Sequence, residues 1–152
     1  MSRLKDLREY IDNELNSLDV EKRVNATAHL YGVSLAATIL AKKRGLNEEL
    51  AAMAGMLHDL HAYKSGSYDD HAHLGAGLAR NILEKLDLTT MEETDTICSA
   101  IYHHDDKLVV DAPMDELLKD ADVIDHCFKD TSKAIIEKEQ QRYNNLCNEL
   151  SL

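Results

Sequence analysis

The chain has 152 residues, a length typical of one compact domain with a real hydrophobic core. Its hydrophobic fraction of 44% excludes a disordered chain, and six Gly with one Pro favour helices over a sheet full of tight turns. The net charge of -11 argues against a nucleic-acid partner, because an acidic surface repels phosphate backbones.

Cysteine usage and hydropathy indicate the cellular setting. The three cysteines are widely spaced and form no CxxC pair, which predicts reduced thiols rather than a disulfide framework or a thiolate zinc site. The N-terminal residues contain no apolar stretch typical of a signal peptide, and no apolar run approaches 18 residues. We therefore expect a cytoplasmic protein without a membrane partner, either a monomer or a homodimer.

The first half of the chain predicts three helices. Leucines and one isoleucine recur every three or four residues over 2–18, which indicates an amphipathic helix. Asp19 can cap a second helix that ends near Arg44, before Gly45. The expected core face of this second helix consists of Val24, Ala28, Tyr31, Leu35 and Ile39.

The third helix is expected to start at Asn47 and to continue through His58, Asp59 and His61. Small residues crowd it, at Ala51, Ala52, Ala54 and Gly55. They would let a neighbouring helix approach closely, so we expect this helix to be the central and most buried one. Residues 62–69, with Lys64-Ser65-Gly66-Ser67, read as a loop.

The second half predicts four more helices. One spans residues 70–86, and one starts with a capping box of Thr90 and Glu93 and ends near His104. Pro113 suits the first turn of a helix that reaches about His126, and a last helix covers residues 131–150. The prediction is one all-α domain, residues 1–152, built as a bundle of six to seven helices.

Histidines beside acids are the unusual chemical feature of the sequence. His58-Asp59 lies between apolar neighbours, and a buried carboxylate costs several kcal/mol unless it is paired or bound to a metal. His29 lies inside an apolar helix, and residues 117–125 place three acids in another. Imidazole with carboxylate suits divalent cations such as Fe, Mn, Zn, Co, Ni or Mg.

The order of His29, then His58-Asp59, then a distant Asp122 resembles the HD-domain superfamily of metal-dependent phosphohydrolases. The segments that carry the resemblance frame residues 23–126, so the helices at 2–18 and 131–150 would flank the motif region. The resemblance implies an HD-type helical bundle. It also implies a divalent cation held by His29, His58, Asp59 and Asp122.

Some similar HD proteins hold two metals, with additional histidines between the doublet and the last Asp. Here His73 and one of His103 and His104 occupy those places, and Asp59 would bridge both ions. His73 is preferred to His71 as a ligand because Gly75-Ala76 follows it. His71, His61 and His126 are expected to be ordinary helix residues. His103 or His104 could also protonate a leaving group.

The function that the resemblance implies is hydrolysis of a phosphoester or phosphoanhydride, on a small nucleotide, by a metal-activated water. Arg23, Lys64 and Lys107 are the candidates for neutralising the phosphorylated substrate. A tyrosine can stack on a base, although core packing is its commoner role. Two alternatives remain open: a di-iron HD-type oxygenase, and a non-catalytic module that senses a nucleotide.

Overall fold

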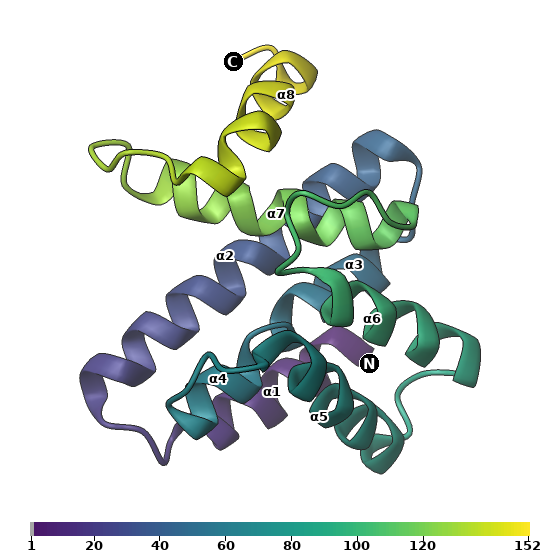
Figure 1. Ribbon diagram of the computed structural model, residues 1–152. Helices are drawn as coiled ribbons and strands as arrows, with labels where there is room; N and C mark the ends of the chain where they lie inside the picture. The colour runs from purple at the N-terminus through teal and green to yellow at the C-terminus, as the bar shows by residue number, and fades with distance from the viewer. Residues whose placement is uncertain (1) are drawn as a thin grey trace.

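The computed structural model describes residues 2–152, and these form helices without strands (Figure 1). The elements are α1 Arg3–Leu15, α2 Val20–Arg44, α3 Glu48–Leu57, α4 Leu60–Ser65, α5 His71–Leu86, α6 Met91–His103, α7 Pro113–Lys129, the 3-10 helix η1 Glu137–Glu139 and α8 Gln140–Leu150. The predicted all-α class is confirmed. The predicted six to seven helices correspond to the longer elements, and α4 is a short helix of 6 residues inside the segment read mostly as a loop.

Helix α3 lies at the centre, as its small residues predicted, and packs against α1, α2, α6 and α7. Every residue from Leu50 to Leu57 is buried. A Cβ on Gly55 would come within 2.7 Å of the backbone of Ser34 on α2. Only glycine therefore allows the observed approach of α2 to α3, and this approach brings His29 on α2 towards His58 at the end of α3.

The face of α2 that enters the core differs from the predicted one. Leu35 is 63% exposed and Ile39 is 53% exposed, whereas the core side is formed by Ala26, His29, Leu30, Val33, Ala37 and Leu40. The helix is apolar on both sides, so its periodicity does not select a face. Close packing against α3 and α7 selects the side with smaller residues.

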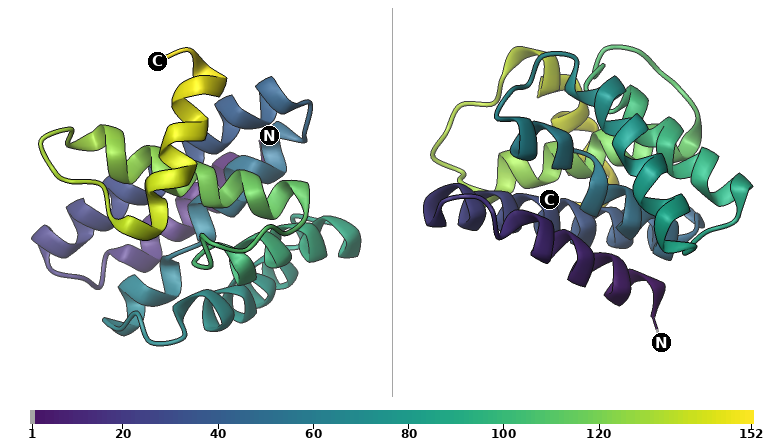
Figure 2. Two further views of the ribbon diagram at one scale, coloured as in Figure 1. Left: turned by 45° about the horizontal axis from the view of Figure 1, so that its top comes forward. Right: turned by 90° about the horizontal axis from the view of Figure 1, so that it is seen from below.

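Helix α2 is long and apolar enough to cross a membrane by length and composition, a test that the core helices of soluble proteins also pass. Half of its most apolar window is buried inside the molecule. The helix lies beside α1 in both views of Figure 2 and also packs on α3 and α7. Its role here is that of a core helix.

Local capping sets most helix boundaries. Asp19 accepts a hydrogen bond from the Lys22 amide, and Thr90 with Glu93 forms both bonds of the predicted capping box. The C-terminal helix is the exception, because the predicted 131–150 element begins only at Gln140. The Asp130 carboxylate binds the amide and hydroxyl of Ser132, and such local bonds compete with a helix.

Candidate metal centre

An elbow between α3 and α4 carries the His58-Asp59 pair. Helix α3 ends at Leu57, and Asp59 has φ -110° and ψ 7°, in the bridge region of backbone space, before α4 begins. The His58 ring donates its Nδ1 hydrogen to the Gly55 carbonyl oxygen at 2.8 Å. The prediction of one continuous helix is wrong here. The elbow turns both side chains towards one space. On a regular helix, adjacent side chains point about 100° apart and would not face the same space directly.

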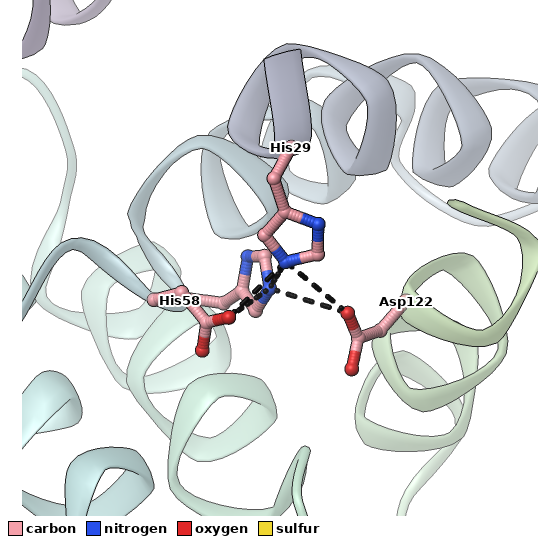
Figure 3. A group of neighbouring side chains, drawn as sticks. His29, His58 and Asp122 are labelled. Carbon is pink, nitrogen blue, oxygen red and sulfur yellow. Dashed lines mark hydrogen bonds and ion pairs between the residues drawn. The ribbon is translucent and has the colours of Figure 1, made fainter. Parts of the chain in front are cut away.

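Four buried side chains from three parts of the chain meet in that space: His29, His58, Asp59 and Asp122. The Nε2 atom of His29 lies 3.1 Å from Asp59 Oδ2 and 3.1 Å from His58 Nε2. Asp122 Oδ1 lies 3.4 Å from the first nitrogen and 3.5 Å from the second. Figure 3 shows His29 entering from α2 and Asp122 from α7, with His58 facing both.

The hydrogen bonds at the back of each ring determine what it presents to this space. His29 Nδ1 lies 2.7 Å from the Asp125 carboxylate, and His58 Nδ1 faces a carbonyl, so both Nδ1 atoms donate. In the neutral ring the opposite Nε2 then carries a lone pair. Two lone pairs and two carboxylates therefore converge, and the buried Asp122 Oδ1 has no hydrogen-bond partner. Such a set of acceptors fits a cation, and the outer bonds orient the rings as they do in metal sites.

A second group lies on the other oxygen of Asp59. Asp59 Oδ1 is 3.1 Å from His104 Nε2 and 3.4 Å from His71 Nε2. His104 Nδ1 donates to the Ile101 carbonyl, and His71 Nδ1 donates to the Tyr68 carbonyl. Both rings therefore use the same tautomer as the first pair. One carboxylate lies between two groups of imidazole lone pairs, which is the arrangement of a bridging ligand.

Residues 27–129 match the family model of the HD domain, a segment that covers more than half of the chain and includes both groups. The chain belongs to the HD-domain family. This family is one of metal-dependent hydrolases that hold divalent cations through His and Asp, and both groups of buried side chains could hold a metal. No solved structure matches the chain.

Two of the histidines predicted for the second ion of this HD domain lie elsewhere. The His73 side chain is 50% exposed and pairs with Asp70, and His103 faces Asp115. His71 and His104 lie beside Asp59 instead. His104 was one of the two alternatives left open by the sequence, whereas His71 was expected to be an ordinary helix residue. His71 and Gly75 are four residues apart on one face of α5, and a Cβ on Gly75 would lie 3.2 Å from the His58 carbonyl oxygen. Gly75 therefore marks the side of α5 that faces the centre, and this spacing could have selected His71 from the sequence.

The carboxylates of the HD centre control the charge on its rings. Burial lowers the pKa of His58, but Asp59 and Asp122 outweigh burial and raise this pKa to about 10. Burial would raise the pKa of Asp59, but the charge of His58 and the hydrogen bond from His104 hold it well below the usual range. In the metal-free protein, protons on the imidazoles balance the buried carboxylates, and a bound cation takes over that role.

Lys107 is the predicted substrate residue that lies at the centre. It is buried, and its Nζ donates to Asp122 Oδ2 and to the His104 carbonyl, both at 2.7 Å. The charge of Lys107 opposes the effect of burial and helps to keep the pKa of Asp122 well below its usual range. Neither Arg23 nor Lys64 lines this site, since Arg23 lines a cleft between α1 and α2 and Lys64 pairs with Glu14 on α1.

Three residues around the centre were missed by sequence reasoning. Asp125 supports His29, and Gly32 leaves room for its carboxylate. His126 was expected to be an ordinary helix residue, yet it stacks on His29 and lies 3.3 Å from Asp122 Oδ1. Glu139, from the C-terminal segment, holds His126 Nδ1 at 2.7 Å. The positions of Asp125 and His126, three and four residues after Asp122, are the only signal in the sequence.

An open cavity of about 450 Å³ gives access to the centre. Its floor contains His29, Asp59, Asp122 and the second pair of histidines. One wall comes from the segment 129–139, which supplies Lys129, Lys133 and Lys138. This volume is in the range of small-molecule sites.

Proposed function

We propose that this HD-domain protein is a metal-dependent phosphohydrolase that acts on a phosphoester or phosphoanhydride of a small molecule, with a nucleotide as the leading substrate. The observation that carries the proposal is the position of Asp59 between two groups of imidazole lone pairs. Imidazole and carboxylate donors suit one or two ions of Fe, Mn, Zn, Co, Ni or Mg. The chemistry that such a cation supplies is polarisation of a phosphoryl oxygen and a lowered pKa of bound water.

The protein side chains have separable roles in this proposal. Asp59 would be the shared ligand. His29, His58 and Asp122 would complete the first site, and His71 and His104 would complete the second. Asp125 orients the His29 ring through its Nδ1 hydrogen. The geometry gives no support to His103 as a proton donor, because it does not line the cavity.

Lysines on the cavity wall offset part of the negative charge around the centre. The chain carries a net charge of -11, yet Lys129, Lys133 and Lys138 line the open side, where they pair with Asp125, Asp130 and Asp105. These lysines reduce the negative potential that a phosphate meets there. A nucleic acid would extend over the acidic surface, so we propose a soluble small-molecule substrate. We also propose a cytoplasmic location and no membrane partner.

The test is metal analysis of the freshly purified protein, followed by measurement of phosphate release from a set of nucleotides. Asp59→Asn is expected to lower metal content and to abolish turnover. The matched control is Asp87→Asn: Asp87 ends α5 with φ 49°, a conformation that Asn adopts readily, so this variant is expected to keep both.

Three outcomes would contradict the proposal. Full retention of metal and turnover by Asp59→Asn would show that this centre is not the active site. Bound iron with oxygen consumption and no phosphate release would indicate the oxygenase. Nucleotide binding to the metal-loaded protein without any turnover would indicate a sensing module.

A further inference from the structure

A side cavity opens next to the metal centre. It has a volume of about 380 Å³ and shares Tyr68, His71 and Asp105 with the main cavity. Its other wall contains His73 and Tyr102, from α5 and α6. Because the shared residues border both cavities, a molecule held at the second group of ligands can extend into the side cavity.

The wall of the side cavity carries a stacked pair of rings. The centroids of His73 and Tyr102 lie 4.0 Å apart, and the ring planes differ by 21°. Asp70 holds His73 Nδ1 at 2.8 Å, which orients this ring. Both rings are about half exposed, with Tyr102 at 46%. Each ring covers one face of the other, so another planar ring can stack on an outer face of the pair. Such stacking buries apolar area without ordering a flexible side chain.

The two cavities differ in their cationic side chains. Lysines lie beside the carboxylates of the main cavity, whereas the described lining of the side cavity contains Asp70, Asp106 and the shared Asp105 without a lysine or arginine. These carboxylates repel a second phosphate and accept hydrogen bonds from N–H groups. The side cavity therefore favours a planar group that has N–H donors and no negative charge, and the lysines and the metal centre of the main cavity favour the anionic part of the same molecule.

We propose that the side cavity is the subsite for the amino-bearing base of a nucleotide. The base stacks against the Tyr102–His73 ring pair while the phosphate lies at the metal centre. The proposal rests on the proposed function for the position of the phosphate. It deepens that function, because it selects nucleotides over phosphorylated sugars that lack a base.

The test compares two probes that differ only in the base, adenosine 5′-monophosphate and ribose 5-phosphate. Their binding to the metal-loaded protein is measured by isothermal titration calorimetry. Since stacking of one base is worth about 5- to 150-fold in affinity, the wild-type protein is expected to bind the nucleotide more tightly by a factor in this range. Tyr102→Ala is expected to remove the difference, and Tyr102→Phe, which keeps the ring, to preserve it.

A matched control lies on the same helix as His73. Leu74→Ala removes an exposed apolar side chain, 48% exposed, that does not line the side cavity, and it is expected to preserve the preference for the nucleotide. Equal binding of the two probes by the wild-type protein, or no nucleotide binding, would overturn the inference. Survival of the preference in Tyr102→Ala would overturn it as well.

Phosphate release separates this inference from the function on which it rests. A base preference that depends on Tyr102, in a protein that releases no phosphate, would refute the hydrolase and keep the base subsite. Equal phosphate release from both probes, without any preference in binding, would keep the hydrolase and refute the subsite.

Discussion

Replacement of Gly32 by alanine tests whether the bond between His29 and Asp125 tunes the metal centre. Gly32 lies three residues after His29 on α2, under the Asp125 carboxylate. A Cβ at this position would lie 3.0 Å from Asp125 Cγ and would overlap Oδ1. Because Cγ itself is involved, rotation of the carboxylate cannot relieve the contact, and the Asp125 side chain has to move away.

The displaced carboxylate loses two partners, since Asp125 Oδ2 lies 2.7 Å from His29 Nδ1 and 2.7 Å from Lys129 Nζ. Loss of the outer partner of a metal-bound histidine costs about 10- to 100-fold in metal affinity, or about 1.4–2.7 kcal/mol. For the metal-free fold, the buried charged hydrogen bond to His29 is worth about 1.5–3 kcal/mol. The ion pair with the half-exposed Lys129 adds little, because solvent screens it. The better helix propensity of alanine returns about 1 kcal/mol. The expected net destabilisation by Gly32→Ala is therefore about 0.5–2 kcal/mol.

Gly77→Ala is the matched control, because Gly77 also lies inside a helix but its Cβ would meet no atom within 4 Å. This variant is expected to gain about 0.5–1 kcal/mol of stability and to keep its metal affinity. Competition with a metal chelator measures the affinity, and urea unfolding of the metal-free protein measures the stability. Equal metal affinity of Gly32→Ala and Gly77→Ala would refute the reasoning. A further loss of metal affinity when Gly32→Ala is added to Asp125→Ala would also refute it, because the two changes act through one bond.

Three further predictions concern the second ion, the response to pH and a helix cap. His71→Ala is expected to lower the number of bound ions and His73→Ala to leave it unchanged, as measured by elemental analysis; the opposite order would restore His73 as a ligand. The pKa of His58 is raised from its ordinary 6.5 to about 10, so its protonation stabilises the metal-free fold fully below pH 6.5, and this contribution is lost as the pH rises towards 10. Urea unfolding of the metal-free protein should show this loss, while added metal stabilises more strongly at higher pH; a metal-free stability that rises over this window would contradict the assignment. Thr90→Ala removes the cap of α6 and should cost about 1 kcal/mol in thermal unfolding without a change in metal content.

Features that depend on local chemistry were predicted from the sequence. The caps at Asp19 and Thr90, the stop at Gly45 and the start of α7 at Pro113 each follow from a few neighbouring residues. The central place of α3 was predicted from its small side chains, which allow neighbouring helices to approach closely. The all-helical class and the HD family could therefore be inferred before any coordinates.

Features that depend on several helices meeting were decided by the tertiary structure. The periodicity of α2 fits two faces, and only packing on α3 and α7 selects the one that carries His29. The choice between His71 and His73 depends on which side of α5 faces the elbow at His58. Two residues along a helix, the separation of His71 and His73, turn a side chain by about half a turn.

The sequence by itself determined the helical class, the family and the residue types of the metal centre, because apolar periodicity, caps and the spacing of His29, His58-Asp59 and Asp122 are properties of the chain. The tertiary structure alone decided that Asp59 lies between two groups of histidines and that Asp125, His126 and Glu139 surround the first. The physical reason is that coordination depends on the directions of side chains from helices that are distant in the chain. Those directions are set by the packing of the bundle.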